Sequence, residues 1–120
     1  MEKFTLPHQH GSAASLNALR EQLCDKQQFD EVSDIFKLLS DSSRVRIFWL
    51  LCHAEECVIN ISALMEMSSP AVSHHLRQLR DAGLIVSRRD GKEVYYTAAK
   101  TQQAALLHRA IEKTIRWQCK

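Results

Sequence analysis

Residues 67–96 read MSSPAVSHHLRQLRDAGLIVSRRDGKEVYY, and the prediction of the fold starts from these residues. Pro70 is a residue type favoured in the first turn of a helix, and Gly83 is the type favoured in the left-handed position that ends one. We therefore expect a helix over 70–82, with Ser69 as its N-cap.

Two β-rich segments follow the helix directly. LIVSR (84–88) and EVYYT (93–97) are rich in β-branched and aromatic residues. Asp90-Gly91 lies between them, and this dipeptide favours a tight hairpin turn. The sequence thus predicts a helix followed at once by a β-hairpin.

The rest of the chain is expected to be helical, in segments whose apolar residues recur at helical spacing. Upstream segments are 15–26 capped by Ser15, a helix capped by Asp30 with Val32, Ile35, Phe36 and Leu39 on one face, and the core helix VRIFWLLCHA (45–54). Next come 60–67, capped by Asn60 with Ile61, Leu64 and Met65 inward, and a last helix to Cys119 with Leu107, Ala110, Ile111 and Ile115 along a face. The order predicts a mainly α (α+β) winged helix–turn–helix with additional helices at both ends. We expect residues 1–14 to be a flexible tail and 15–120 to be one domain.

Composition is that of a soluble globular chain, with 45% apolar and 25% charged residues among 120. The longest strictly apolar run, IFWLLC (47–52), is too short to span a bilayer, and no secretory signal is recognisable. We expect a cytoplasmic protein with no membrane partner, whose four cysteines stay reduced. The net charge of +2 indicates nothing about partners unless the basic residues share one surface.

The predicted helix over 70–82 has two different faces. Each residue turns the helix by about 100°, which places Val72, Leu76 and Leu79 on a buried stripe. The opposite face carries the polar set Ser73, His74, Arg77, Arg80 and Asp81. His75 falls beside the buried stripe, so His74 and His75 point apart and form a poor metal pair, because helical pairs prefer i, i+4 spacing.

The polar face suits duplex DNA, because hydroxyl, imidazole and guanidinium groups hydrogen-bond base edges and phosphates in the major groove. The expected hairpin adds Arg88, Arg89 and Lys92 around its turn, where they can reach the backbone. The alternatives are a merely solvated face and a winged helix that contacts only proteins. An enzyme is disfavoured, since Cys57 with His53 is the only sequence-local nucleophile and base pair.

The stretch 67–96, together with LLSDSSRVRIFWLL (38–51), resembles the ArsR/SmtB family of winged helix–turn–helix repressors. The resemblance spans about residues 30–98. It implies a homodimeric repressor whose first and last helices build the dimer interface, and which leaves its operator DNA when an inducer, commonly a metal ion, binds. Carried over by position, it implies DNA contacts at Ser69, Ser73, His74 and Arg77.

The inducer site departs from the family pattern. Many relatives carry Cys-Val-Cys before the first helix of the helix–turn–helix, and EECVIN (55–60) keeps Cys57 but has Ile59 at the second thiol. Other relatives use an Asp-x-His and a later His-x-x-His or Glu on the last helix. The matching positions here are KTQ (100–102) and the region of Lys113 and Arg116, so that site is expected to be absent.

A transition or soft metal ion such as zinc or cadmium nevertheless remains the favoured inducer. Its candidate ligands are Cys57, Cys24, His53, His8 and His10. Cys52 is expected to be a packed core residue, and His108 an interface or surface residue. The alternatives are a thiol-redox repressor, in which Cys57 pairs with another cysteine, and a repressor with no inducer site on this chain.

Overall fold

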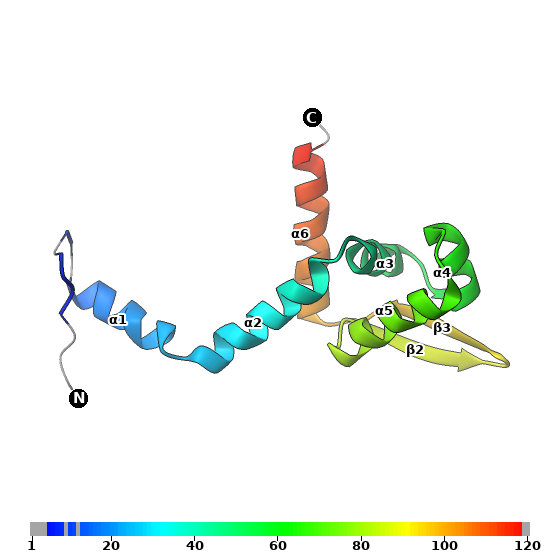
Figure 1. Ribbon diagram of the computed structural model, residues 1–120, viewed down its shortest axis with the longest axis horizontal. Helices are drawn as coiled ribbons and strands as arrows, with labels where there is room; N and C mark the ends of the chain where they lie inside the picture. The colour runs from blue at the N-terminus through cyan, green and yellow to red at the C-terminus, as the bar shows by residue number, and fades with distance from the viewer. Residues whose placement is uncertain (1–4, 9, 12, 119–120) are drawn as a thin grey trace. The chain divides into compact units, whose positions relative to one another are not determined.

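The computed structural model of the protein describes residues 5–8, 10–11 and 13–118 (Figure 1). Its contacts divide the chain into two compact units, one up to Asp34 and one from Ile35 onward. The elements are α1 (Ala13–Leu23), α2 (Lys26–Leu39), α3 (Ser42–His53), β1 (Glu56–Cys57), α4 (Val58–Met65), α5 (Ser69–Asp81), β2 (Ile85–Asp90), β3 (Glu93–Ala98) and α6 (Gln102–Gln118). This order confirms the predicted winged helix–turn–helix with additional helices.

The first two helices begin earlier than the sequence suggested. Helix α1 starts at Ala13, so Ser15 lies inside it and is not its cap. Helix α2 starts at Lys26, because the Asp25 carboxylate accepts a hydrogen bond from the Gln28 amide at 3.2 Å and so caps it. Asp30, predicted as the cap, lies within the helix.

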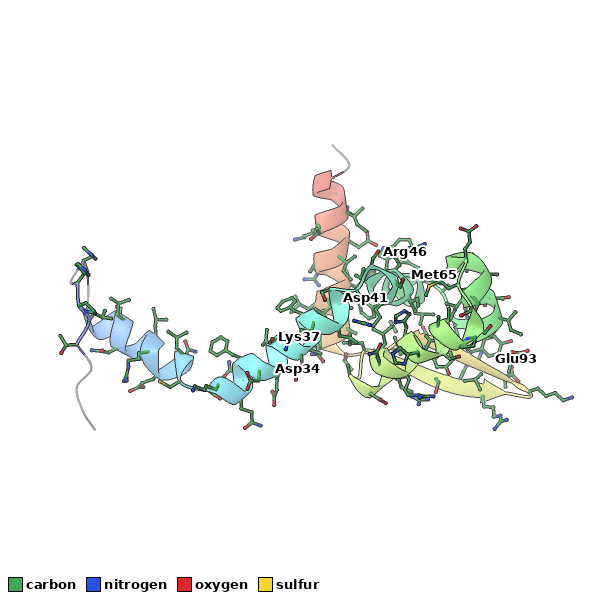
Figure 2. The ribbon with its side chains drawn as sticks, in the orientation of Figure 1. Asp34, Lys37, Asp41, Arg46, Met65 and Glu93 are labelled. Atoms are coloured by element: carbon green, nitrogen blue, oxygen red, sulfur yellow. The ribbon has the colours of Figure 1, made fainter. Side chains whose placement is uncertain are left out.

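Helix α3 is capped by Asp41, which Figure 2 shows between the end of α2 and α3. Its Oδ1 accepts the Arg44 amide at 3.0 Å, and this bond holds the pKa of the Asp41 carboxyl below its usual range. Arg44 in turn donates to the Leu38 carbonyl at 2.7 Å and to the Gln78 amide oxygen at 3.1 Å. One guanidinium therefore joins the end of α2 and the start of α3 to α5.

Helix α4 also begins before its predicted cap. Cys57 occupies the N-cap position, without a side-chain capping bond. Asn60 lies inside the helix and donates from Nδ2 to the Glu56 carboxylate at 2.8 Å. Leu64, predicted to point inward, is 60% exposed, whereas Met65 beside it is buried.

The sheet has three antiparallel strands in the order β1-β3-β2. Strands β2 and β3 form the predicted hairpin, with Arg88 opposite Tyr95. Its two-residue loop is Gly91-Lys92, one position later than predicted, with Gly91 at φ 65° as the first residue of the loop. The short β1 was not predicted; it pairs Cys57 with Tyr95 and so adds a third strand to the β2–β3 hairpin, which is the wing.

The N-terminus of α5 is capped one residue earlier than predicted. The Ser68 hydroxyl accepts the Ala71 amide at 3.3 Å, so Ser68 is the N-cap and Ser69 is the first helical residue. Ser69 is free to point its hydroxyl elsewhere, and its Oγ lies 3.2 Å from that of Ser62 in α4. This contact joins the two helices of the helix–turn–helix.

Helix α5 ends at Asp81, and Gly83 takes the left-handed position just beyond the C-cap Ala82, as predicted. Gly83 has φ 78°, its amide donates to the Arg80 carbonyl at 2.9 Å, and the Leu84 amide donates to the Leu79 carbonyl at 3.0 Å. This pair of bonds is a Schellman motif, which needs a left-handed residue at this position. The motif turns the chain from α5 into β2.

Replacing Gly83 with alanine is expected to destabilise the protein by about 1–2 kcal/mol, the cost of a left-handed conformation for an L-residue. An added Cβ would meet no atom within 4 Å, so the loss comes from the backbone and not from a clash. Urea denaturation measures it. Gly83→Asn is the control: it should lose less, because asparagine tolerates this conformation better. Equal losses would contradict the backbone explanation.

The core lies between α3, α4, α5 and the base of the wing. Its fully buried large side chains are Phe48, Ile47, Leu51, Ile61, Leu76, Leu79, Leu84, Ile85 and Val72. Helix α6 adds Ala104, while Leu107 and Ile111 pack against the core from the same helix. The predicted end of this helix at Cys119 lies outside the described residues. No helix in the described part of the chain is long and apolar enough to cross a membrane.

Candidate DNA-binding surface and metal-ligand cluster

Helix α5 has one buried and one exposed face, as its sequence predicted. Val72, Leu76 and Leu79 are at most 1% exposed. His74, Arg77 and Arg80 are exposed on the other side, and Ser73 is half-buried. The apolar stripe anchors the helix, so the polar residues are held in fixed directions on its outer face.

The two adjacent histidines have different surroundings. His74 is exposed, whereas His75 is half-buried and its Nδ1 is buried without a hydrogen-bond partner among the described residues. Their rings are 6.0 Å apart and tilted by 52°. His75 therefore belongs to the packing of α5, and His74 to the outer face.

The basic residues of the wing differ in how freely they can contact DNA. Arg88 donates two hydrogen bonds to the Glu55 carboxylate, at 2.8 and 2.6 Å, and its guanidinium lies 4.9 Å from the centre of the Tyr95 ring. These hydrogen bonds hold the pKa of Glu55 below its usual range. All three basic residues are exposed, but the guanidinium of Arg88 is engaged with Glu55, so Arg89 and Lys92 are better placed for phosphates. Figure 2 shows Glu93 near the tip of the same hairpin.

The predicted metal ligands are spread over both units. Cys24, His8 and His10 belong to the first unit and are exposed, with the two imidazole rings stacked 5.7 Å apart. Cys57 and His53 belong to the second unit, where Cys57 is buried and His53 is exposed. Within the described residues, Cys57 is not part of any group of three or more metal-ligating side chains.

A different group does converge in the second unit. His53 at the end of α3 meets His108 and Glu112 of α6, with their ligand atoms all within 4.8 Å of one another. Nε2 of His53 lies 2.9 Å from Oε1 of Glu112 and 3.1 Å from Nε2 of His108. His108 Nε2 lies 3.2 Å from the same oxygen. Of these residues, His53 was predicted from the sequence as a metal ligand, His108 was predicted to be an interface or surface residue, and Glu112 was not predicted. The i, i+4 spacing of His108 and Glu112 was the signal available in the sequence.

Trp49 completes the surroundings of this cluster. Its indole N–H donates to Oε1 of Glu112 at 2.8 Å. This bond, followed by that from His53, holds the pKa of Glu112 below its usual range, so the carboxylate stays ionised. Burial, together with the negative charge of Glu112, raises the pKa of the neighbouring Cys52 to about 11. Cys52 is therefore a protonated thiol at neutral pH, as expected for a packed core residue.

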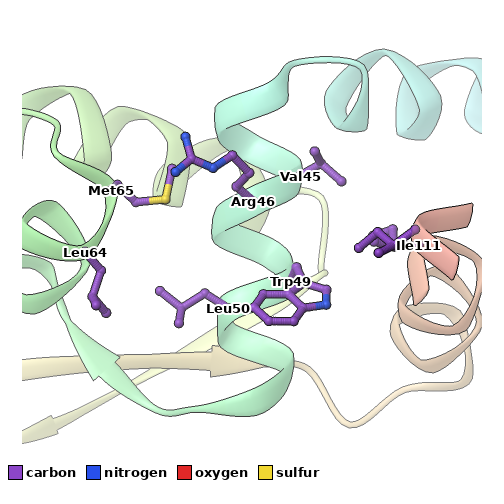
Figure 3. Close-up of a pocket in the computed structure, with 8 residues that line it drawn as sticks. Val45, Arg46, Trp49, Leu50, Leu64, Met65 and Ile111 are labelled. Atoms are coloured by element: carbon purple, nitrogen blue, oxygen red, sulfur yellow. The ribbon is translucent and has the colours of Figure 1, made fainter. Parts of the chain in front are cut away.

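An apolar pocket of about 460 Å³ lies between α3, α4 and α6 (Figure 3). Most of its wall is aliphatic, and Trp49 projects into it on the side of α3 that faces Ile111. It is lined by Val45, Arg46, Trp49, Leu50, Leu64, Met65, Ile111 and Ile115. Because Trp49 also bonds to Glu112, the pocket and the cluster share one side chain.

The fold and the outer face of α5 define a winged-helix DNA-binding regulator. Residues 41–87 match the family described as bacterial regulatory proteins of the arsR family. The chain is 34% identical over 96 residues to a homologue of the cadmium resistance transcriptional regulatory protein CadC from Staphylococcus aureus, covering 79% of this chain and 78% of that protein. The chain belongs to the ArsR family, and it is a transcriptional regulator and not an enzyme.

Solved structures of similar proteins support this placement. The transcriptional repressor BigR from Xylella fastidiosa superposes with a TM-score of 0.69 at 26% identity, over 84% of this chain and 97% of that one. The homodimeric winged helix–turn–helix DNA-binding domain of Mb0332 from Mycobacterium bovis superposes with a TM-score of 0.68 at 26% identity, over 78% and 86%.

Proposed function

We propose that the protein is a homodimeric repressor that binds operator DNA through α5 and the wing and releases it when a metal ion binds. The observation that carries this proposal is the exposed basic face of α5, held in place by an opposite face that is almost fully buried. A fixed helix with such a face fits the major groove of duplex DNA.

Different parts of the surface would contact different parts of the DNA. Ser73, His74 and Arg77 lie centrally on the outer face and would reach base edges, since imidazole and guanidinium groups bond to them. Residues at the helix ends and on the wing would contact phosphates; these are Ser69, Arg80, Arg88, Arg89 and Lys92. Of these, Ser69 and Arg88 already have partners, Ser62 and Glu55, which they would share or exchange on binding.

Exposed apolar side chains support the dimer. Large ones stand on α1, α2 and α6, namely Leu16, Leu19, Leu23, Phe29, Val32, Phe36, Leu106 and Ile115. Surfaces of this kind mark protein–protein contacts, and the similar Mb0332 domain is a homodimer. A dimer of this chain would read two half-sites about one helical turn apart, or a multiple of that distance.

A metal inducer is supported by the similarity to a protein named for cadmium resistance. Cys57, Cys24, His53, His8 and His10 stay predicted ligands. The described geometry groups only His53 of this set with other ligating side chains. Cys52 gives no support to thiol oxidation, because its raised pKa keeps that thiol protonated at neutral pH.

DNA binding should depend steeply on salt, because each phosphate contact releases a counterion. Between about 50 and 200 mM salt we expect the affinity for a duplex, selected from a random pool by the protein itself, to fall about 10³-fold or more. That drop corresponds to roughly six to ten phosphate contacts per dimer. Fluorescence anisotropy measures it. Weak binding that does not change with salt would contradict the proposal and favour a winged helix that contacts only proteins.

A further inference from the structure

We propose that His53, His108 and Glu112 form a metal site that takes a divalent ion of intermediate softness, such as Zn²⁺, Co²⁺ or Ni²⁺. The inference rests on the proposed function, because it names the ligands and the ion class of the inducer site. It involves none of the cysteines and none of the positions at which relatives carry the thiolate pair or the last-helix ligands.

The spacing of the three ligand atoms fits such an ion. Nε2 of His53, Nε2 of His108 and Oε1 of Glu112 form a triangle with sides of 2.9, 3.1 and 3.2 Å. Zinc bonds of about 2.0–2.1 Å in a tetrahedron separate the ligand atoms by about 3.3–3.4 Å. The triangle therefore needs to widen by only a few tenths of an ångström to become one face of that tetrahedron, and the fourth position is left for water.

Hydrogen bonds alone cannot satisfy all three contacts of this triangle. Each imidazole Nε2 carries at most one proton, and the two nitrogens face each other as well as the same carboxylate oxygen. Whichever ring donates to the other ring loses its bond to Glu112. A cation at the centre accepts a lone pair from all three atoms at once. It can therefore satisfy all three atoms together, which hydrogen bonds cannot.

The surroundings hold the ligands in the required directions. His108 and Glu112 are spaced i, i+4 on α6, so they share one face of the helix. The indole N–H of Trp49 orients the carboxylate, in the way that hydrogen bonds from outer residues orient metal ligands. The side chains of His53, His108 and Glu112 are 46, 29 and 29% exposed, so an ion can enter from solvent.

The donor atoms select the ion class. Two imidazoles and one carboxylate suit zinc, cobalt and nickel, whereas thiolates are what select softer ions. Two histidines and a glutamate are also a ligand set that binds zinc in enzymes with an open fourth position. This chain should therefore differ in its ion preference from relatives that bind through cysteine pairs.

The position of the site connects it to the DNA-binding surface. It would join α6 to the C-terminal end of α3. Two residues further along, Glu55 holds Arg88 of β2, and the Leu51 carbonyl accepts a hydrogen bond from Thr97 of β3 at 3.3 Å. Both strands of the wing are bonded to residues at this end of α3. A metal ion that fixes the end of α3 would therefore also affect the position of the wing.

Cobalt titration of the full chain, purified under reducing conditions and stripped with a chelator, tests the site without DNA. We expect visible absorption from bound Co²⁺ without a thiolate charge-transfer band. The signal should remain in Cys57→Ser and in the matched control Glu31→Gln. In Glu112→Gln and His108→Gln, the affinity for Co²⁺ should fall about 100-fold or the signal should disappear. Circular dichroism verifies that each variant is folded.

A thiolate band that Cys57→Ser abolishes would overturn the proposal, and so would wild-type protein that binds no Co²⁺ or Zn²⁺. Either result, with salt-dependent DNA binding intact, leaves the proposed DNA-binding function standing.

The regulatory part is tested by adding Zn²⁺ to the protein bound to its selected duplex. Zinc should lower the DNA affinity about 5–150-fold, the usual range of coupling between two sites, in wild type and in Cys57→Ser. The effect should be absent in Glu112→Gln and His108→Gln. Equal release from wild type and both cluster variants would overturn the role of this site as the inducer site.

Discussion

Phe48→Ala is expected to lower the free energy of unfolding by about 3–5 kcal/mol, the range for phenylalanine truncations in packed cores. Phe48 is fully buried on α3, between the helix–turn–helix and the wing. Truncation removes the apolar area of the ring and leaves a cavity that the surrounding helices cannot fill. Because a small domain is stable by only about 5–15 kcal/mol, the variant should lose a large fraction of its total stability.

Urea denaturation at a fixed protein concentration measures this loss, since the stability of a dimer depends on concentration. Ile59→Ala is the control. Ile59 is 66% exposed on α4, and surface substitutions usually change stability by less than about 0.5 kcal/mol. A Phe48→Ala loss as small as that of Ile59→Ala would mean that the centre of the core lies elsewhere.

The sequence predicted the parts of the fold that are encoded locally. Pro70 and Gly83 mark the two ends of α5 within a residue, because backbone preferences of single residues decide helix ends. The buried stripe of α5 follows from helical periodicity alone. The N-cap was misplaced by one residue because Ser68 and Ser69 are equally good capping types, and only the contact of Ser69 with Ser62 distinguishes them.

The parts that were missed depend on contacts between distant residues. Strand β1 is two residues long and exists because β3 pairs with it, so no local sequence pattern predicts it. Leu64 has the spacing of an inward residue, yet it is exposed in the pocket wall. The ligand cluster joins His53 to His108 and Glu112, which are 55 and 59 positions further along the chain. Only the pair on α6 was visible in the sequence, and one pair does not define a site.

Arg77→Ala is expected to weaken DNA binding about 5–150-fold, which corresponds to the 1–3 kcal/mol of a good base contact. Its free energy of unfolding should stay within about 0.5 kcal/mol of wild type, because Arg77 is exposed. His75→Ala should do the reverse. It removes a half-buried ring from the packing of α5, so it should cost about 1 kcal/mol of stability and leave the affinity of the folded protein nearly unchanged.

Anisotropy with the selected duplex and urea denaturation separate these two outcomes. His74→Ala is the matched control for His75→Ala: it removes the same side chain one position away, where it is exposed, and it should weaken DNA binding without a loss of stability. If Arg77→Ala and His75→Ala lowered DNA binding equally, and only in proportion to lost stability, the assignment of the two faces of α5 would be wrong.

The salt dependence of Arg77→Ala then decides what Arg77 contacts. A phosphate contact contributes to the slope of affinity against salt, so its loss should reduce that slope by about one unit per protomer and weaken binding to every sequence alike. A base contact contributes little to the slope, and its loss should relax the preference at one position of each half-site. The central position of Arg77 on the outer face, opposite the buried stripe, favours the second result, because the middle of that face is the part that enters the groove most deeply.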